Sequence, residues 1–300
     1  MYEQPVDKKP VMKTKHLHKI PEKKQVWPCI GSIKYDGVYA YQIIVPGDYR
    51  IFSATGMQYH SLKHIEKSAK ENLFNMEHCV LIFEVYHADY PINIISGYCR
   101  EEKAQHPELY AVVHDCIPYR DFVEQACQIP YFMRKGNINR IFDEAKVEHY
   151  NLPMEFTLVN LDDAEEVFNT LTANGHEGII GRNPNGMWLG GHRRNEDLWK
   201  MKIELSYDLE VTHVFEGAGK YKDTLGTLGC RFRLDGESDG LLDTVICSGM
   251  TDAQRHAWWA DPSSIIGKIV KVDAMTFTKN GLLREPRFKE VREDKNEADF

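Results

Sequence analysis

The feature that most constrains the fold of this sequence is a change of pattern near residue 203. Beyond it, short segments rich in β-branched and aromatic residues alternate with turns, and the pairs Asp235-Gly236 and Asn280-Gly281 are strong hairpin signals. Strands are expected at residues 207–215, 229–234, 244–247, 269–277 and 287–291. A helix is expected over 251–259, with Thr251 as its cap. Five short strands and one helix in about 95 residues predict a small Greek-key β-barrel.

Before residue 203 the sequence alternates strands and helices without a regular repeat. The expected strands are 38–45, 49–53, 80–86 and 109–114, and the expected helices are 61–75, much of 119–149, and 161–174. A glycine pattern of the GxGxxG type is lacking, which argues against a dinucleotide fold. A chain of 300 residues also exceeds what one core usually supports. We therefore predict an α+β protein with two domains, 1–203 and 204–300.

Composition excludes several classes of protein. The chain is 42% hydrophobic, as globular proteins are, and none of its apolar runs approaches the ~20 residues that span a bilayer. The formal net charge of −8 argues against a wholly basic nucleic-acid coat, but not against an enzyme with local basic patches. The seven cysteines form no CxxC pair, so we expect reduced thiols and no closed zinc site. These features predict a protein of a reducing compartment without membrane association.

The N-terminal segment, residues 1–24, is rich in lysine. It carries seven lysines against three acidic residues, and its three prolines exclude a long helix. Two interpretations remain open at this point. The segment is either a solvated, loosely held arm or a source of contacts to phosphate groups.

Two motifs in the first domain place charged side chains beside apolar strands. Lys34-Tyr35-Asp36-Gly37 lies between two strand-like segments. A lysine there is ordinarily a surface residue, but neighbouring cations would make it lose its proton and become a nucleophile. Glu84 interrupts an apolar strand, so its carboxylate either faces solvent at the strand end or meets a cation, a hydroxyl or water.

Two further motifs close the first domain. Glu177 opens an apolar strand that Arg182 ends. Lys200 and Lys202 project from the same face of an extended strand. Two ammonium groups on one face are unfavourable unless an anion lies between them, which points to phosphate; a solvated basic edge is the alternative.

The order of these motifs resembles that of the covalent nucleotidyltransferases, which include DNA ligases, RNA ligases and mRNA capping enzymes. In the second domain, Arg292-Glu293-Asp294-Lys295 is similar to the family's Arg-x-Asp-Lys signature, and residues 281–288 resemble the Leu-Arg-x-Pro-x-Phe segment of ATP-dependent DNA ligases. The resemblance extends over most of the chain and is strongest to small two-domain bacteriophage ligases. It implies an adenylyltransferase domain of ATP-grasp-like mixed α/β topology, followed by a C-terminal OB-fold β-barrel.

The resemblance also implies an activity and a set of site residues. The expected activity is ATP-dependent sealing of 5′-phosphate/3′-hydroxyl nicks in duplex DNA, with AMP carried on Lys34 and then on the 5′-phosphate. Mg²⁺ or Mn²⁺ is expected as the metal, and the protein is expected to be a monomer in a bacterial or phage-infected cytoplasm. The implied ATP-binding residues are Ile33, Lys34, Tyr35, Glu84, Tyr110, Lys200, Lys202, Arg292 and Lys295. The implied metal ligands are Glu84, Glu177 and Asp294, and the implied DNA contacts are Lys13, Lys15, Arg193, Arg194, Lys220 and Lys222.

Two departures from the family pattern stand out. Tyr39 and Ala54 occupy positions where the family usually has arginines that touch the nucleotide or the nick phosphate. Arg50, Arg100 or the N-terminal lysines are candidates to replace them. The residue that stacks on adenine is either Tyr110, which we prefer, or His114.

Two alternative functions are kept. One is an RNA ligase or a GTP-using mRNA capping enzyme of the same superfamily, although the Leu-Arg-x-Pro-x-Phe segment favours DNA. The other is a non-catalytic binder whose OB fold holds nucleic acid. Retention of Lys34, both glutamates and the two strand lysines argues against that reading.

Overall fold

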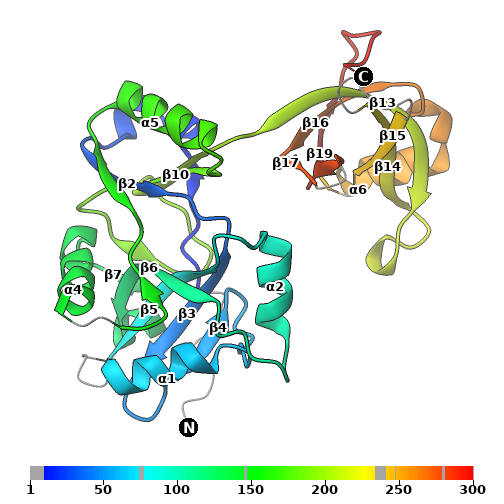
Figure 1. Cartoon of the computed structure of the whole chain (residues 1–300). Helices are drawn as coiled ribbons and strands as arrows, with labels where there is room; N and C mark the ends of the chain where they lie inside the picture. The colour runs from blue at the N-terminus through cyan, green and yellow to red at the C-terminus, as the bar shows by residue number, and fades with distance from the viewer. Residues whose placement is uncertain are drawn as a thin grey trace. The chain divides into compact units, whose positions relative to one another are not determined.

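The computed structural model describes residues 10–73, 78–144, 147–233, 241–246, 248–278 and 281–299. The chain divides into two compact units, Met1–Lys202 and Ile203–Phe300 (Figure 1). The expected hairpin turn at 235–236 lies outside the described residues, and the turn at 280–281 lies partly outside them.

Two five-stranded sheets form the framework of the first unit. The first sheet has the order β4-β3-β5-β6-β8 and the second has the order β1-β12-β10-β2-β9. The strands of the first sheet are β3 (Val38–Ile44), β4 (Ile51–Ser53), β5 (Cys79–Tyr86), β6 (Tyr110–Pro118) and β8 (Tyr150–Asn151). Those of the second are β1 (Lys15–His16), β2 (Cys29–Ile33), β9 (Glu155–Leu158), β10 (Gly178–Arg182) and β12 (Leu198–Lys202). A separate pair joins β7 (Ala126–Cys127) to β11 (Trp188–Leu189).

The helices of the first unit are α1 (Lys63–Asn72), α2 (Ile92–Arg100), α3 (Tyr119–Glu124), α4 (Tyr131–Glu144) and α5 (Leu161–Ala173). The helices expected near 61–75 and 161–174 are present, whereas α2 was not predicted. The helical stretch expected over 119–149 is broken after Glu124, because Gln125 adopts a left-handed backbone (φ 59°) that ends α3. None of the described helices is long and apolar enough to cross a membrane.

The first sheet is buried on both faces. On one face Phe83 and Val113 pack with Ile65 of α1 and Ile95 of α2; Figure 1 shows these two helices beside the sheet. On the other face Tyr41, Ile43 and Ile82 pack with Phe122 and Trp188. A sheet covered on both sides explains why β3 and β5 read as continuous apolar runs rather than as alternating strands.

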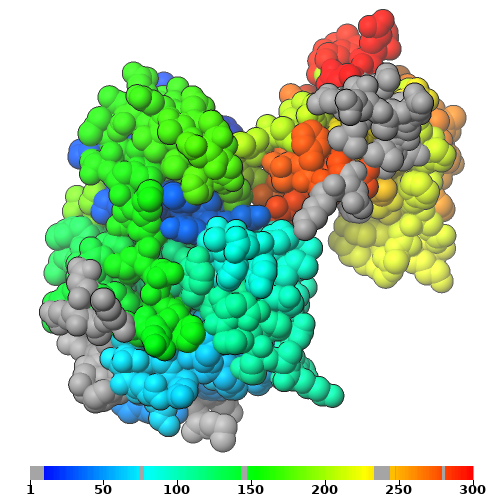
Figure 2. Space-filling view, in the orientation of Figure 1, coloured from blue at the N-terminus to red at the C-terminus, as the bar shows by residue number. Residues whose placement is uncertain are grey.

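The N-terminal segment is not a loosely held arm from residue 10 onward. Leu17 and Ile20 are only 2% and 3% exposed, and β1 pairs in parallel with β12. Farther back along the segment, His192 N–H donates to Val11 O at 2.8 Å. In the space-filling view, blue atoms from the early part of the chain lie directly against green atoms from later segments of the first unit (Figure 2). The burial of these two apolar side chains and the backbone pairing together hold in place a segment that is otherwise rich in lysine.

The second unit is built on one five-stranded antiparallel sheet with the order β15-β14-β13-β16-β19. Its strands are β13 (Leu205–Glu216), β14 (Leu225–Arg233), β15 (Leu241–Ile246), β16 (Ile269–Ala274) and β19 (Arg287–Val291), with a small hairpin of β17 (Thr276–Phe277) and β18 (Leu283–Arg284). An isolated parallel bridge between Ser248 and Arg287 brings the two edges of the sheet into contact. The described ladders do not close into a complete barrel, so the unit is OB-like.

Helix α6 (Asp252–Ala260) begins as expected from the sequence. The Thr251 hydroxyl accepts from Gln254 N–H, and the Gln254 side chain accepts from Thr251 N–H, which together form a capping box. The core of the unit includes Leu228, Phe232, Val270 and Phe288. Short 3-10 helices complete the molecule at Leu17–Lys19, Glu22–Lys24, Gly219–Tyr221 and Pro262–Ser264.

Candidate active site

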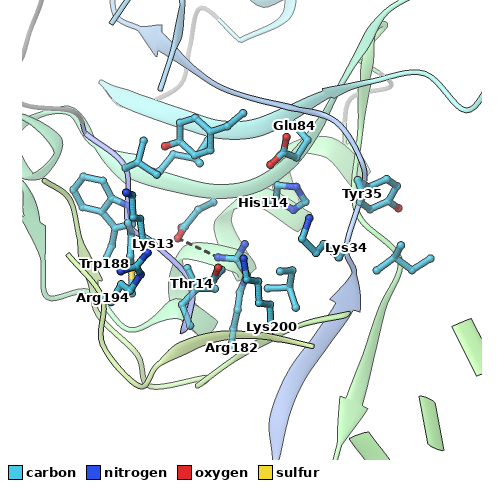
Figure 3. A pocket seen from close by; sticks show the side chains of 18 residues that line it. Lys13, Thr14, Lys34, Tyr35, Glu84, His114, Arg182, Trp188, Arg194 and Lys200 are labelled. Atoms are coloured by element: carbon cyan, nitrogen blue, oxygen red, sulfur yellow. Dashed lines mark ion pairs between the residues drawn. The ribbon is translucent and has the colours of Figure 1, made fainter. Parts of the chain in front are cut away.

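A cavity of about 410 Å³ lies between the two sheets of the first unit (Figure 3). Glu84 enters it from the β5 wall, and Arg182 and Lys200 enter it from the β10 and β12 wall, with Lys34 and His114 between them. The remaining lining residues are Val11, Met12, Lys13, Thr14, Ile33, Tyr35, Tyr39, Ile82, Asp115, Ile180, Trp188, Arg194 and Leu198. The N-terminal segment therefore contributes directly to this cavity.

Lys34 is fixed at the end of β2 by its backbone and by its side chain. Its N–H donates to Gly178 O at 2.9 Å, and its Nζ donates to Glu177 Oε2 at 2.5 Å. The two side chains are 21% and 16% exposed, so the pair is partly shielded from water but open to the cavity. A lysine beside a carboxylate that can accept its proton meets the first requirement for an amine nucleophile.

Two glycines allow this close arrangement. A Cβ atom at Gly37 would lie 2.7 Å from Val85 O and 3.1 Å from Glu84 Cβ, so the turn after Lys34 approaches β5 closely only with glycine. Gly178 has φ 151°, and a Cβ atom there would lie 2.1 Å from Met201 O. Gly37, in the turn after Lys34, and Gly178, directly after Glu177, thus allow the close approach of the backbone segments that carry Lys34, Glu84 and Glu177.

The surroundings of Glu84 disfavour the charged form of its carboxyl group. Burial raises the pKa of its carboxyl group to about 8; the charge of Lys34 opposes this, and the charges of Glu177 and Asp36 add to it. Of the alternatives that the sequence left open, the structure places Glu84 in the cavity, where the charge of Lys34 acts on it while Lys34 itself is bonded to Glu177.

A β-bulge places two more polar side chains in the cavity. In the β5–β6 ladder, Phe83 pairs with Val113 and the next residue back, Ile82, pairs with Asp115, so His114 is the extra residue. Because of the bulge, the side chains of β6 no longer alternate between the two faces at this point. The neighbouring residues His114 and Asp115 therefore both line the cavity. Burial lowers the pKa of His114 well below its usual value, and the charges of Arg182, Lys135 and Lys34 lower it further. The imidazole is therefore neutral at physiological pH.

The residues expected to bind ATP are only partly gathered in the cavity. Ile33, Lys34, Tyr35, Glu84 and Lys200 line it, whereas Tyr110 and Lys202 are not among its described lining residues. Tyr110 contacts Tyr86 edge to face, with 5.8 Å between ring centroids. His114 lines the cavity, and its ring centroid is 6.2 Å from that of Tyr35.

The residues expected to contact DNA from the first unit differ in their surroundings. Lys13 and Arg194 line the cavity. Lys15 Nζ forms an ion pair with Glu196 at 2.8 Å. Arg193 donates from its guanidinium to the carbonyl oxygens of Gly190, at 2.8 Å, and Gln125. Lys15 and Arg193 therefore have structural partners within the protein.

In the second unit, Arg292 and Lys295 are held by carboxylates. Arg292 donates to both oxygens of Asp294, at 2.8 and 2.7 Å, and to Asp208 Oδ2 at 2.7 Å. Lys295 Nζ donates to the same Asp208 oxygen. Hydrogen bonds from Arg292 lower the pKa of Asp294 to about 2. The exposed Lys220 ammonium lies 4.4 Å from the centroid of the Tyr221 ring, and Lys222 is also exposed.

Of the candidates to replace the missing arginines, Arg50 is already engaged. Its guanidinium donates to both oxygens of Asp48, at 2.8 and 2.7 Å. Arg182, which the sequence analysis noted only as the end of a strand, lines the cavity instead. The register explains this, because Ile180 pairs with Lys200 and Arg182 follows two residues later on the same face.

Two carboxylates close to Lys34, Glu84 in the cavity and Glu177 bonded to the lysine, have the chemistry of ligands for a divalent metal ion. Glu177 Oε1 is buried and has no hydrogen-bond partner among the described residues. The charge of Glu177 acts on Glu84, which lines the cavity, so both carboxylates are candidates to bind one cation. The described residues contain no cluster of three or more His, Cys, Asp or Glu side chains that could hold a metal unaided. Mg²⁺ commonly binds through one or two carboxylates plus substrate phosphates, so two donors suffice.

In the first unit a lysine is paired with a glutamate, and the cavity between the two sheets is rich in cations. Together with an OB-like second unit, these features define the class of two-domain covalent nucleotidyltransferases. Residues 11–202 match the family model described as the ATP dependent DNA ligase domain, and residues 216–292 match that of the DNA ligase OB-like domain. The chain belongs to the ATP-dependent DNA ligases.

Individual relatives agree with this assignment. The DNA ligase of Halobacterium salinarum is 29% identical over 213 residues, which cover 63% of this chain and 36% of the relative. That of Methanococcus aeolicus is 24% identical over 186 residues, covering 62% and 32%. The chain thus spans about a third of the length of these curated relatives. A solved Lig E DNA ligase shares the fold, with a TM-score of 0.69, 16% identity and coverage of 94% of this chain and 99% of that one.

Proposed function

We propose that this protein is a DNA ligase that uses ATP to seal 5′-phosphate/3′-hydroxyl nicks in duplex DNA. The observation that carries the proposal is the Lys34–Glu177 pair at the mouth of a cavity whose opposite walls supply Glu84 and the cations Arg182 and Lys200. This arrangement suits the transfer of a nucleotidyl group through a lysine, because a nucleophile, a proton acceptor and phosphate-binding cations lie together.

In the first step, the Lys34 amine attacks the α-phosphorus of ATP. An N–P bond forms, the bond to the pyrophosphate oxygen breaks, and the lysine proton passes to Glu177 Oε2, which lies 2.5 Å away. Arg182 and Lys200 neutralise charge on the phosphates. His114, which lines the cavity near Tyr35, is proposed to stack on the adenine base in preference to Tyr110, which is not among the described lining residues.

In the second step, a 5′-phosphate oxygen of the nick attacks the same phosphorus and releases Lys34. In the third step, the 3′-hydroxyl attacks the 5′-phosphate and expels AMP. The chain's contribution to these two steps is mainly positioning and charge neutralisation. A divalent metal ion, Mg²⁺ or Mn²⁺, would be held by Glu84 and Glu177 and would supply further neutralisation of phosphate charge.

The second unit is proposed to supply Arg292 and Lys295 to the β- and γ-phosphates of ATP. Both cations are held by Asp208 in the structure, so binding a triphosphate requires that they exchange a carboxylate for phosphate oxygens. Arg292 donates to both carboxylate oxygens of Asp294. Asp294 would therefore have to give up these hydrogen bonds to act as a metal ligand.

Contacts to DNA are proposed to be made with backbone phosphates, because a nick-sealing enzyme must act on any sequence. Lys13, Arg194, Lys220 and Lys222 are the proposed donors; Lys15 and Arg193 would contribute only by leaving the partners they have within the protein. The protein is also proposed to act as a monomer in a bacterial or phage-infected cytoplasm.

The test is to incubate the protein with α-³²P-labelled ATP and magnesium, and then to add a nicked duplex. We expect a covalent AMP adduct, its transfer to DNA and a sealed strand. Lys34→Ala should abolish adduct formation, whereas Lys67→Ala, at a surface lysine of α1 that is 75% exposed, should not. Labelling with GTP instead of ATP would indicate a capping enzyme, and sealing of RNA but not DNA would indicate an RNA ligase. Absence of any adduct would contradict the proposal.

A further inference from the structure

The cavity contains one unusual hydroxyl group. Tyr39 follows the Lys34–Gly37 turn on β3, directly opposite Glu84 on β5. Its ring lines the cavity, but its hydroxyl oxygen is buried and has no hydrogen-bond partner among the described residues. A buried hydroxyl without a partner is unfavourable, and in a cavity it marks a place where a ligand completes the hydrogen bond. Burial raises the pKa of Tyr39, so the group remains protonated and can donate.

Arg182 lines the same cavity as Tyr39. It lies on β10 in the opposite wall, and its positive charge acts on Tyr39. Its Nη1 is 4.0 Å from Asp115 Oδ2, beyond hydrogen-bond distance. Asp115 is already satisfied by Arg134, which donates to its two oxygens at 2.8 and 2.9 Å. The charge of Asp115 is thus largely neutralised by another residue, and the guanidinium of Arg182 can bind an anion.

The ring of Tyr131 keeps Arg182 in place. The Arg182 guanidinium carbon lies 5.0 Å from the centroid of that ring, and its side chain is only 16% exposed. A guanidinium fixed over an aromatic face loses little freedom on binding a ligand. The described lining of the cavity carries five cations, Lys13, Lys34, Arg182, Arg194 and Lys200, against two carboxylates, Glu84 and Asp115. The cavity as a whole therefore favours an anion.

We propose that the Tyr39 hydroxyl and the Arg182 guanidinium together form a phosphate-binding subsite, in which the hydroxyl donates to one phosphate oxygen and the guanidinium binds another. The proposal deepens the proposed function and rests on it for the identity of the phosphate. The phosphate belongs either to the bound nucleotide or to the 5′ end of the nicked strand. Tyr39 is then a neutral donor where the family usually has an arginine, and Arg182 supplies the charge from across the cavity.

The test uses Tyr39→Phe, which removes only the hydroxyl. Tyr41→Phe is the matched control, because Tyr41 lies on the same strand, is buried against Phe52 and is not among the described residues that line the cavity. Two binding measurements avoid any dependence on catalysis. Calorimetry with ATP is done in the Lys34→Ala background, and the affinity for a nicked duplex with a 5′-phosphate is compared with that for one with a 5′-hydroxyl.

If the phosphate is that of the nucleotide, Tyr39→Phe weakens ATP binding about ten- to a hundredfold, the loss of one hydrogen bond to a charged group. If it is that of the nick, ATP binding is unchanged and the preference for a 5′-phosphate is lost by a similar factor. Arg182→Gln should weaken binding of the same ligand that Tyr39→Phe affects. The loss of affinity in the double variant should be smaller than the product of the two single losses, because both residues hold one phosphate.

The proposal is overturned if Tyr39→Phe binds both ligands as tightly as Tyr41→Phe does. It is also overturned if Tyr39→Phe and Arg182→Gln act on different ligands. These outcomes are separate from failure of the proposed function. A wild-type protein that forms no AMP adduct contradicts ligase activity but leaves a measured effect of Tyr39 on phosphate binding intact.

Discussion

Lys34 Nζ lies 2.5 Å from Glu177 Oε2, although the two residues are 143 positions apart in the sequence. The pairing changes the expected chemistry of the lysine. Neighbouring cations alone would favour a neutral amine, whereas a carboxylate favours the ammonium and also offers a site for its proton. In the proposed mechanism, Glu177 is therefore the acceptor of the Lys34 proton.

Replacing Glu177 with glutamine should slow formation of the AMP adduct about a hundredfold, within the usual range for loss of a general base. Glutamine keeps the size of the side chain but cannot take the lysine proton. Single-turnover labelling with ATP measures the rate. Glu71→Gln on α1, at an exposed carboxylate 3.8 Å from Lys67, is the control and should label normally. An unchanged rate in Glu177→Gln would show that the proton leaves by another route.

Much of this site could be predicted from local sequence. Four charged residues each end an apolar strand or interrupt one: Lys34, Glu84, Glu177 and Lys200. Three of them, Lys34, Glu84 and Lys200, line one cavity, and Glu177 is bonded to Lys34. The strands themselves were recognisable because their β-branched runs are bounded by turn residues. Such signals depend only on neighbouring residues.

Other features depend on contacts between distant parts of the chain. The entry of His114 and Asp115 into the cavity follows from a register shift between β5 and β6, which no single strand encodes. The pairing of Arg292 and Lys295 with Asp208 spans more than 80 residues. Helix α2 contains Gly97 and several isoleucines, which have low helix propensity, and its burial against the first sheet overrides that preference.

Gly178→Ala should destabilise the first unit by about 1–3 kcal/mol, the usual cost of a residue forced into a disfavoured backbone region. The cause is both the φ of 151° and the approach of a new Cβ atom to Met201 O. Gly136→Ala on α4 is the control, because among the described residues no atom outside the adjacent backbone of the helix lies within 4 Å of the position of its Cβ. That helical substitution should be neutral or stabilising by about 0.5–1 kcal/mol. Urea denaturation measures both, and equal midpoints would contradict the prediction.

The ion pairs of Asp208 should make the stability of the second unit depend on pH. Burial alone would raise the pKa of Asp208, but the hydrogen bond from Lys295 and the charge of Arg292 outweigh it and lower the pKa. A carboxyl group whose pKa is lower in the folded state adds stability above its unfolded pKa of about 3.8, and this stability is lost as the pH falls through the folded pKa.

Asp208→Asn should therefore lower stability at pH 7 by about 1–3 kcal/mol and have a smaller effect at pH 3. Glu293→Gln, at a carboxylate that is 72% exposed and 3.3 Å from Lys268, serves as the control and should change little at either pH. Urea denaturation across this range gives the two curves. A constant difference between wild type and Asp208→Asn at all pH values would contradict the linkage.

Replacing Lys220 and Lys222 together with glutamine should weaken binding to a nicked duplex and make that binding less dependent on salt. Both side chains are exposed, so each can neutralise a DNA phosphate without first breaking an ion pair that is buried in the protein. Each phosphate contact contributes about 0.9 to the slope of log affinity against log salt concentration, so losing two should reduce the slope by about 1.8. Formation of the AMP adduct should be unchanged, because neither residue is among the described residues that line the cavity with Lys34. Replacing Lys67 and Lys70 of α1 removes the same charge from another surface, and an equal change of slope in that variant would indicate a general charge effect rather than contacts made by this segment.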